Sequence, residues 1–540
     1  MVNINVDALV VGAGFAGIYQ TYRLRELGFN VRCIDKAGGV GGTWYWNRYP
    51  GAMSDTETYL YRYSWDKEDL CSYPWTHTYV YQPQILEYLN HVVDKHNLRK
   101  NMQFHTEMTS ADWDEESRLW TITCATGDKF VARYLINALG LLSTPNYPNI
   151  KGIDSFQGTL VHTASWPEDL DLNNKTVGVI GNGSTGVQVL TALAPKVKRL
   201  VSFQRHPQYS VPSGQGPVQK GYRQWVNENY DQIYQGVWNS STGFGVPEVS
   251  TPTMSVSAEE RERTFQALWD QGNGFRFMFS GFGDITTNET ANIEACKFIR
   301  SKIDEIVKDP KKAAVLKPKD LYARRPLCDT GYYQIFNQEN VDIVGLQDTP
   351  ITSIVPEGIE TADGKVHKLD VLIFATGFDA IEGSYLRVAI KGRNHRTLKE
   401  EWKDGASAFA AVAVPGFPNM FLISGPQGPF ANFPCSIESE VNFITACIQH
   451  AENQGTNGIN GTVRKSPIMV AKPEANKAYQ DLCFKLTEGS LFTKSASWIF
   501  GTNLEGRKPV VKFYFGGLKA YRDLTGEEEK QGFPSFSCQH

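Results

Sequence analysis

Two short glycine-rich segments have the spacing of nucleotide-binding turns. The first, residues 12–17, follows an apolar run and precedes a helical pattern, the order that aims a helix N-terminus at a pyrophosphate. Within it, Gly12 permits a tight turn, Gly14 lets the backbone approach the phosphates, and Gly17 lets the helix pack closely on the strand. Asp35 ends the next apolar segment, where an acid accepts a hydrogen bond from a free ribose 2′-hydroxyl and would repel a 2′-phosphate. The first segment therefore predicts a site for FAD or NAD.

The second glycine-rich segment predicts a different nucleotide. It follows the apolar run 176–180, and its expected phosphate-binding residues are Gly181, Gly183, Ser184, Thr185 and Gly186. The strand expected after its helix ends in Arg205 and His206 rather than in an acid. Because an arginine presents a planar fork of donors to phosphate oxygens, this site is predicted to bind NADPH. His206 is the weaker candidate, since a histidine on a surface is usually neutral and solvated near pH 7.

Aromatic side chains are concentrated in a glycine-rich loop at residues 41–55. A core strand does not combine glycines, polar groups and rings in this way, so we expect the loop to pack on a flat ring system. A second unusual segment, residues 156–167, lies between the two nucleotide-binding regions.

Together these segments resemble the type I Baeyer–Villiger monooxygenases, the group that includes cyclohexanone monooxygenase. The family pattern FxGxxxHxxxW is met by Phe156, Gly158, His162 and Trp166. A second family pattern, GGxWxxxxYPGxxxD, is met by Gly41, Gly42, Trp44, Tyr49, Pro50, Gly51 and Asp55. The resemblance covers essentially the whole chain.

The resemblance implies an enzyme that inserts one oxygen atom of O2 next to a ketone carbonyl. In this family NADPH reduces FAD, oxygen adds to give a C4a-peroxyflavin, and the ketone becomes an ester or lactone. The expected cofactors are thus FAD and NADPH, and the expected partners are a small-molecule ketone and O2. Two alternatives stay open: a flavin monooxygenase that oxygenates nitrogen or sulfur, and a non-catalytic flavin-binding or redox-sensing protein.

The resemblance also assigns catalytic roles to Arg325 and Asp55. A guanidinium stays charged and offers a planar donor fork to an anion, and Asp55 would pair with it beside the flavin. On the residues alone, Arg324 and Arg325 could equally form a solvated surface pair, and Asp55 could make local turn hydrogen bonds. Relatives often carry lysine at the position of Arg324, where the side chain contacts the 2′-phosphate.

Other positions receive roles only through the resemblance. The expected FAD contacts are Thr43, Trp44, Trp46, Asp55, Tyr61, Met108 and Phe433. The NADPH contacts are expected to include Arg324 and Trp498, in addition to the second glycine-rich segment. The expected walls of the substrate pocket are Leu141, Leu142, Phe430, Asn432, Phe433 and Phe515. For His162 we favour a structural or conformational role over proton transfer, because it lies in a linker between nucleotide-binding regions.

The elements needed to position these residues predict an α/β fold with two Rossmann-like dinucleotide-binding domains and a helical insertion. Residues 1–150 and 381–540 are expected to form the FAD-binding domain. The NADPH-binding domain is expected at residues 151–215 and 331–380, and residues 216–330 carry the helical patterns of the insertion.

Composition excludes several other classes. The 540 residues are 41% hydrophobic and 21% charged with a net charge of -4, which disfavours a nucleic-acid partner. No apolar run approaches the ~20 residues that span a bilayer, and no signal-peptide pattern occurs, so we predict a cytoplasmic protein without a membrane partner. The nine cysteines form no CxxC pair, which argues against a metal site or a dithiol reductase. The oligomeric state stays open, a monomer being compatible, and the polar segment 526–540 is expected to be partly disordered.

Overall fold

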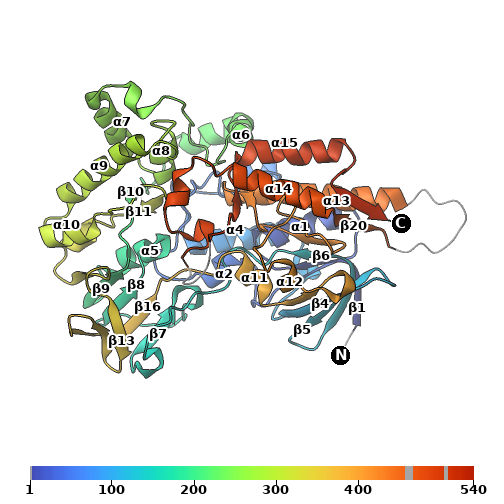
Figure 1. Cartoon of the computed structure of the whole chain (residues 1–540), viewed down its shortest axis with the longest axis horizontal. Helices are drawn as coiled ribbons and strands as arrows, with labels where there is room; N and C mark the ends of the chain where they lie inside the picture. Colours follow the sequence, from blue (N-terminus) through green and yellow to red (C-terminus); the bar gives the residue numbers. More distant parts are fainter. Residues whose placement is uncertain (1–2, 456–465, 504–508, 540) are drawn as a thin grey trace, which may run out of the picture.

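The computed structural model describes residues 3–455, 466–503 and 509–539. The chain forms two α/β units that lie side by side, and a group of helices covers one of them (Figure 1). Each unit is built on a sheet whose central parallel strands are mostly buried, as expected for strands covered on both faces. The predicted α/β fold with two dinucleotide-binding folds is therefore confirmed.

The first sheet is organised around the N-terminal strand β1 (Asn3–Val11). It pairs in parallel with β2 (Val31–Ile34) on one side and with β6 (Lys129–Asn137) on the other. The strand order is β17-β4-β5-β6-β1-β2-β3, and β18 also pairs with β6. The remaining strands are β3 (Met102–Gln103), β4 (Met108–Asp114), β5 (Leu119–Cys124), β17 (Ala389–Lys391) and β18 (Met420–Leu422). The first sheet thus unites strands from both ends of the sequence.

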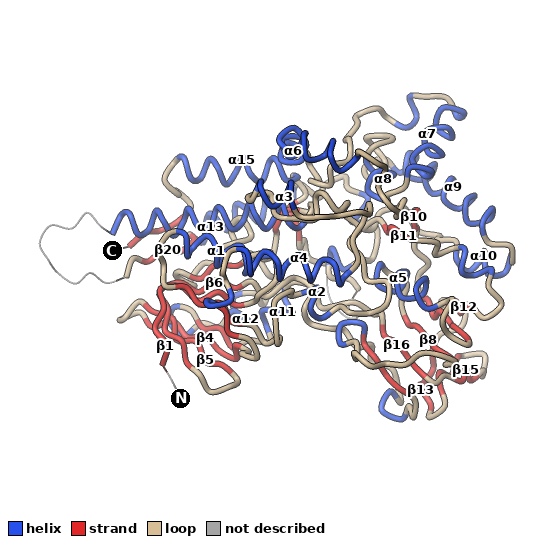
Figure 2. Tube along the Cα trace, turned by 180° about the vertical axis from the view of Figure 1, so that it is seen from behind, coloured by secondary structure: helices blue, strands red, loops and turns tan. Residues whose placement is uncertain are grey.

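Helices from both ends of the sequence also pack together on this sheet. Helix α1 (Phe15–Glu26) lies beside α13 (Phe433–Gly455), and hydrogen bonds from Tyr19 to Asn442 and from Gln20 to Thr445 join them (Figure 2). The other helices of this unit are α2 (Thr43–Trp46), α3 (Lys67–Ser72), α4 (Gln82–Lys95), α11 (Glu382–Leu386), α12 (Leu398–Glu401), α14 (Pro473–Lys485) and α15 (Gly517–Lys530).

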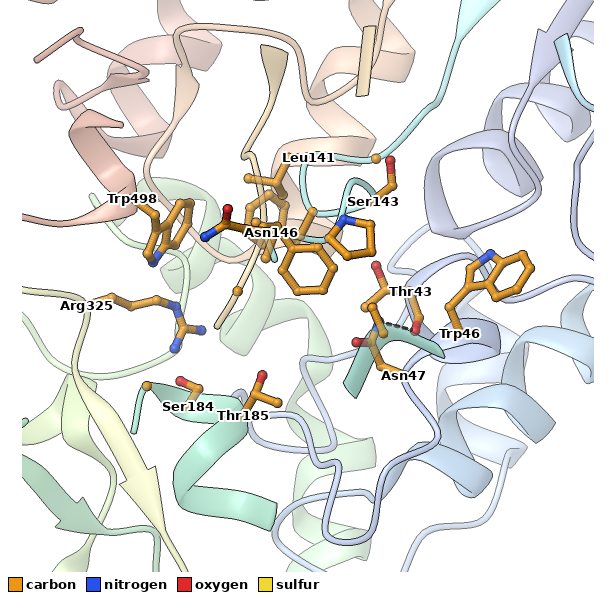
Figure 3. A pocket seen from close by; sticks show the side chains of 18 of the residues that line it. Thr43, Trp46, Asn47, Leu141, Ser143, Asn146, Ser184, Thr185, Arg325 and Trp498 are labelled. Atoms are coloured by element: carbon orange, nitrogen blue, oxygen red, sulfur yellow. Dashed lines mark hydrogen bonds between the residues drawn. The ribbon is translucent and has the colours of Figure 1, made fainter. Parts of the chain in front are cut away.

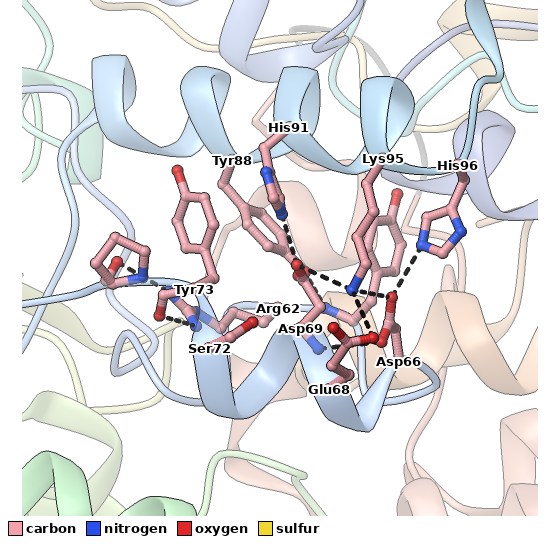
Figure 4. Close-up of polar contacts among 12 residues, drawn as sticks. Arg62, Asp66, Glu68, Asp69, Ser72, Tyr73, Tyr88, His91, Lys95 and His96 are labelled. Atoms are coloured by element: carbon pink, nitrogen blue, oxygen red, sulfur yellow. Dashed lines mark hydrogen bonds and ion pairs between the residues drawn. The ribbon is translucent and has the colours of Figure 1, made fainter.

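Ion pairs between charged side chains, which we call the α3–α4 clamp, join the short helix α3 to α4 (Figure 4). Asp66, the N-cap of α3, accepts from Lys95 at 2.8 Å and from His96 at 2.9 Å, while His91 contacts Asp69 at 2.5 Å. Residues 62–66 connect Tyr61 to α3, and Asp66 is part of the clamp. The clamp therefore also holds this connecting segment against α4.

The second sheet is parallel throughout, in the order β12-β9-β8-β16-β7. Its strands are β7 (Thr159–His162), β8 (Thr176–Ile180), β9 (Arg199–Gln204), β12 (Val341–Gly345) and β16 (Val371–Phe374), and helix α5 (Ser184–Leu193) follows β8. A small antiparallel sheet of β13 (Ile351–Val355), β14 (Gly358–Thr361) and β15 (Val366–Lys368) lies between β12 and β16 in the sequence. The strand–turn–helix at β8 and α5 repeats the arrangement at β1 and α1.

Helices dominate the stretch between β9 and β12. They are α6 (Tyr222–Asn239), α7 (Ala258–Gln271), α8 (Gly274–Phe279), α9 (Glu289–Ile306) and α10 (Pro310–Leu316). The parallel pair β10 (Ser210–Pro212) and β11 (Leu327–Asp329) brings the two ends of this stretch together. Helix α6 departs from the rest, because its buried Tyr230 and Tyr234 pack in an apolar cluster with Tyr59, Trp75 and Leu518 of the first unit.

The C-terminal segment is ordered, so the expectation of partial disorder at 526–540 was wrong for the residues that are described. Helix α15 continues to Lys530, and β22 (Phe536–Gln539) pairs antiparallel with β20 (Ile468–Ala471). Phe533 and Phe536 are 4% and 5% exposed, so two aromatic anchors fix a segment whose polar composition hid them. Within the described ranges, every helix is too short or too polar to cross a lipid bilayer.

Candidate active site

A cavity of about 1010 Å³ lies between the two units, at the carboxyl ends of the central strands of both sheets. Open α/β sheets bind ligands at this edge, because the turns after the strands expose backbone N–H groups there. Both glycine-rich turns line the cavity, so two sites that were predicted separately share one chamber. Figure 3 shows Ser184 and Thr185 of the second turn on one side of the cavity and Thr43 and Trp46 on the other.

The first turn fits a pyrophosphate. Gly12 has φ +112°, and a Cβ there would collide with the carbonyl of Ala138. A Cβ on Gly17 would strike the carbonyl of Gly12, so Gly17 serves helix packing and does not line the cavity. Asp35 is buried at the cavity edge and accepts from the backbone N–H of Ala13 at 2.6 Å and of Ala37 at 2.8 Å. Each carboxylate oxygen retains a lone pair, which a ribose hydroxyl could use.

The second turn has the same design. Gly181 has φ +108°, and a Cβ on it would strike the backbone of Ala375, while a Cβ on Gly186 would strike Gly181. A Cβ on Gly183 would meet open space, and this residue caps the N-terminus of α5. Ser184 and Thr185 in the first turn of α5 also line the cavity. Free N–H groups at a helix N-terminus, with room beside them, suit a phosphate.

Three basic side chains line the cavity near the second turn. Arg205 is exposed at the end of β9, and His206 contacts Gln347 through Nδ1 at 2.9 Å. Burial lowers the pKa of His206, and Arg205 and Arg324 lower it further. Arg324 itself donates to Asp320 at 2.6 Å and to the carbonyl of Ala496 at 3.0 Å. The positive charge gathers where the ribose of a nucleotide on the second turn would lie.

The aromatic loop forms a wall on the side of the first sheet. Thr43, Trp44 and Trp46 lie on α2 and line the cavity, and the indole of Trp44 donates to the hydroxyl of Tyr61 at 3.0 Å. Burial raises the pKa of Tyr61 well above its usual range, so its hydroxyl stays neutral. Met108 at the start of β4 also lines the cavity. The loop is thus the ring-lined surface expected for a flat cofactor.

Arg325 and Asp55 meet in this cavity although they lie far apart in the sequence. Two parallel hydrogen bonds join them: Nη2 to Oδ1 at 2.8 Å, and Nη1 to Oδ2. The Arg325 guanidinium carbon also lies 5.2 Å from the centre of the Phe275 ring. Burial lowers the pKa of Arg325, but the Asp55 carboxylate outweighs burial and raises it, so the guanidinium stays charged. The pair presents a fixed cation beside both nucleotide turns.

The expected substrate walls fall into two groups. Leu141, Leu142, Phe430, Asn432 and Phe433 line the cavity, as does Trp498 at the opposite end from Trp46 in Figure 3. Phe515 does not line the cavity. Its ring stacks on those of Phe430 and Phe500, with ring centres 5.4 Å and 5.8 Å apart, so Phe430 lies between Phe515 and the cavity. Its position shows that Phe515 supports the wall and does not form it.

The segment FxGxxxHxxxW lies outside the cavity. Phe156, Gly158, His162 and Trp166 do not line it, whereas Ala164 and Ser165 between them do. Burial lowers the pKa of His162 to about 4, and its Nδ1 accepts from the backbone N–H of Ala164 at 3.1 Å. This neutral, buried ring at the end of β7 agrees with a structural position.

The helical stretch supplies cavity residues that the sequence patterns did not indicate. Phe244 and Phe275 line the cavity and stack with ring centres 3.8 Å apart. No glycine turn or charged pair marks them, so only the fold shows that this stretch closes the cavity over Arg325. Asn146 and Ser143, after β6, were missed for the same reason.

Comparisons with known proteins agree on one family. Residues 9–244 match the family model described as pyridine nucleotide-disulphide oxidoreductase. The chain is 48% identical to cyclohexanone 1,2-monooxygenase of Acinetobacter sp, over 99% of this chain and 97% of the relative. It is also 48% identical to phenazine N-monooxygenase PhzNO1 of Lysobacter antibioticus, over 98% and 96%. The structure matches that of cyclohexanone monooxygenase from Rhodococcus sp. Phi1 bound to NADP+ with a TM-score of 0.96, at 47% identity and over 100% of both chains.

The fold and the cavity define a flavoprotein-type monooxygenase with two dinucleotide sites. More narrowly, the chain belongs to the Baeyer–Villiger monooxygenases, in the group of cyclohexanone monooxygenase. The resemblance stated from the sequence is therefore confirmed. The match to a disulphide oxidoreductase model reflects the shared nucleotide-binding fold, since the sequence has no CxxC pair.

Proposed function

We propose that this protein uses NADPH and O2 to convert a ketone into an ester or lactone, with FAD as its bound cofactor. The balanced reaction joins ketone, NADPH, H+ and O2 and releases ester, NADP+ and water. One observation carries the proposal: the Asp55–Arg325 pair stands where the two nucleotide turns face one cavity. A pair that served structure alone would not need to face the meeting point of two cofactor sites.

Each part of the cavity has a role in this reaction. FAD, when bound, supplies the activation of oxygen. The first turn and Asp35 hold its pyrophosphate and ribose, and the second turn with Arg205 and Arg324 holds NADPH. Arg325 stabilises negative charge that develops during oxygen transfer, and Asp55 orients its guanidinium. Phe244, Phe275 and Phe430 exclude water from the chamber.

The strands of the two sheets support the proposed domain division. We assign residues 1–150 and 381–540 to an FAD-binding domain, which the strands of the first sheet support. Residues 151–215 and 331–380 carry the second sheet and are assigned to the NADPH-binding domain. Residues 216–330 are assigned to the helical insertion, although α6 packs on the first domain.

A second candidate is oxygenation of a ring nitrogen. It is favoured by the 48% identity to phenazine N-monooxygenase, which equals the identity to cyclohexanone 1,2-monooxygenase. The same nucleotide sites serve either reaction, so only the products separate them. The Asp55–Arg325 pair favours the ketone, because a charged donor fork suits an acceptor on which negative charge develops.

The test is a panel of cyclic, linear and aryl ketones together with phenazine and a thioether. NADPH consumption, O2 consumption and products are measured in the same samples. We expect one O2 per NADPH and an ester or lactone from at least one ketone. Heteroatom oxides without any ester would replace the proposal by the second candidate, and an unreduced flavin in the presence of NADPH would favour a sensor.

The assembly and location are proposed on narrower grounds. We propose a monomer as the simplest assembly, because one chain supplies both glycine-rich turns and the Asp55–Arg325 pair. Free cysteines and a need for NADPH support the cytoplasm, where thiols stay reduced. Light scattering on the purified protein and fractionation of its host cells test these two statements.

A further inference from the structure

A second, largely buried ion pair joins residues that lie close in the chain to Asp55 and to Phe275. Glu57 Oε1 and Arg276 Nη2 are 2.7 Å apart, and the two side chains are 9% and 14% exposed. Neither residue lines the cavity. The pair joins the loop after Asp55 in the first unit to helix α8 of the insertion, so it connects two parts of the chain that have no shared strand.

Each member of this pair lies within two residues, along the chain, of a residue that contacts Arg325. Glu57 follows Asp55 by two residues, and Arg276 directly follows Phe275. Asp55 holds the edge of the guanidinium through two hydrogen bonds, and Phe275 lies against it at 5.2 Å. The Glu57–Arg276 pair therefore links the loop that carries Asp55 to the helix that carries Phe275.

Helix α8 needs such a tether. It has only six residues, and an isolated helix of this length is unstable in water. Its N-cap, Asn273, has φ +77° and accepts from the backbone N–H of Phe275 at 2.9 Å. Arg276 also stabilises the N-terminal end of α8, because its Nη1 donates to the carbonyl of Gly272 at 3.0 Å. The same guanidinium thus stabilises α8 and binds it to the loop of Asp55.

Helix α8 also touches the strand that follows Arg325. The backbone N–H of Gly274 donates to Cys328 Sγ at 3.2 Å, and a Cβ on Gly274 would lie 2.8 Å from the carbonyl of Leu327. Movement of α8 would therefore shift both Phe275 and β11, and with β11 the backbone that carries Arg325. The side-chain amide of Asn273 donates to the hydroxyl of the fully buried Tyr79 at 2.9 Å, which attaches the N-terminus of α8 to the first unit.

We propose that Glu57 and Arg276 are positioning residues that hold the Arg325 guanidinium in the place required for oxygen transfer. The inference rests on the proposed function, in which Arg325 acts on the oxygen-transfer step. Reduction of the flavin by NADPH does not require that placement. Loss of the pair should therefore divert the two electrons of NADPH to the reduction of O2 to hydrogen peroxide, with consumption of NADPH and H+.

The experiment compares the purified, FAD-loaded wild type with Glu57→Gln, Arg276→Met, Arg276→Lys and the double variant Glu57→Gln/Arg276→Met. Ester, hydrogen peroxide, the anaerobic rate of flavin reduction and Tm are measured for each. Lys95→Met is the matched control, because it breaks a partly buried ion pair between two residues that do not line the cavity. A crystal structure of the double variant reports the Asp55–Arg325 geometry without reference to activity.

We expect both charge-removing single variants to lower the rate of ester formation by up to about 100-fold, as small misplacements of a catalytic group do. Flavin reduction should change less than about twofold, and peroxide should replace ester. The double variant should recover Tm, because no charge is left buried without a partner, yet remain uncoupled. Arg276→Lys should restore part of the ester, and Lys95→Met should lower Tm without forming peroxide.

The possible outcomes distinguish the proposed function from the positioning role. If the wild type forms no ester from any ketone, the proposed function fails. If the wild type forms ester and the double variant does so with wild-type coupling and an unmoved Arg325, the positioning role is overturned. The positioning role is also overturned if peroxide rises in Lys95→Met as much as in the Glu57 and Arg276 variants.

Discussion

At the scale of residues, the cavity contains a charged pair, Asp55 and Arg325. Burial acts against a cation, yet the two hydrogen bonds from Arg325 to Asp55 keep the guanidinium charged and hold its donor fork in one orientation. One face of the guanidinium rests on Phe275, which leaves the open side of Arg325 toward the cavity. A fixed cation of this kind stabilises developing negative charge without any reorganisation at the moment of reaction.

Arg325→Ala is expected to separate the two halves of the reaction. NADPH should still reduce the flavin, because the second turn is untouched. Ester formation should fall by about 100- to 1000-fold, corresponding to the ~2.7–4 kcal/mol typical of one preorganised donor. Stopped-flow reduction and product analysis measure the two halves. Ester formation close to the wild-type rate would remove Arg325 from the oxygen-transfer step.

His206 is expected to make nucleotide binding depend on pH. Burial, Arg205 and Arg324 lower its pKa, so His206 is neutral at and above neutral pH and gains its charge only as the pH falls. A bound 2′-phosphate favours the charged ring, and a charge-assisted hydrogen bond contributes about 1.5–3 kcal/mol. His206 should therefore increase the affinity for 2′,5′-ADP roughly tenfold more at about pH 6 than at about pH 8, measured relative to a variant without this side chain.

Calorimetry of 2′,5′-ADP binding across this pH range provides the measurement. His206→Thr is the control, because its remaining pH dependence reports the phosphate alone. Arg205→Ala should weaken binding at all pH values and raise the KM for NADPH more than the KM for NADH. Parallel pH curves for the wild type and His206→Thr would show that His206 does not contact the phosphate.

At the scale of elements, the clamp between α3 and α4 shows how a short helix is held in place. Burial by itself raises the pKa of Asp66, but hydrogen bonds from Lys95, the Asp69 N–H and His96 outweigh it and lower the pKa. The folded-state pKa thus lies below the value of ~3.9 of an unfolded chain. The clamp is therefore fully stabilising above about pH 3.9 and loses this contribution as the pH falls through the folded-state pKa.

Lys95→Met tests the clamp. At about pH 7 it should lower the free energy of unfolding by about 1 kcal/mol, and the difference from wild type should shrink below about pH 3.9. Lys67→Met is the matched control, because the Lys67–Asp231 pair is exposed and contributes little. Chemical denaturation of the holoenzyme at both pH values gives the comparison. A loss that is equal at both pH values would show that packing of the Lys95 stem matters, not its charge.

At the scale of the whole molecule, the two units touch through the aromatic loop and α5. Tyr49 donates to Gln188 at 2.9 Å, and Gln188 donates to the carbonyl of Met53 at 3.0 Å. Gly51 allows this approach: it has φ +85°, and a Cβ on it would lie 2.6 Å from the Gln188 carbonyl and 2.9 Å from Ala192. This contact therefore joins the aromatic loop to the helix that follows the second glycine-rich turn.

Gly51→Ala is expected to push the units apart. It should lower stability by about 2–4 kcal/mol, from the left-handed backbone and the clash together. Flavin reduction by NADPH should slow, because the two nucleotide sites move relative to each other. Gly127→Ala is the control, since Gly127 has φ +87° and no atom within 4 Å of the added Cβ, so it isolates the backbone cost. Equal effects of both variants on flavin reduction would show that the contact does not set the cofactor spacing.

Much of the cavity could be predicted from contiguous residues. The two glycine-rich turns were expected from their order of strand, turn and helix. Each turn needs glycine locally, either because φ is positive or because a Cβ would clash with neighbouring backbone. Phe515 shows the limit. An aromatic residue beside the cavity can form the wall or support it, and only packing shows that this ring lies behind Phe430. No sequence pattern marked Phe244 or Phe275 as cavity residues, because the insertion shows only the periodicity of ordinary helices.

The sequence by itself determined the fold class, the two nucleotide turns and the family, because these depend on residues close together in the chain. The tertiary structure decided which side chains act on one another. Asp55 and Arg325 are 270 residues apart, and Glu57 and Arg276 are 219 apart. The family resemblance predicted the first pairing, but no local pattern of residues indicates either one, because both arise where the insertion meets the first unit. The shared cavity and the second ion pair therefore exist only in the folded molecule.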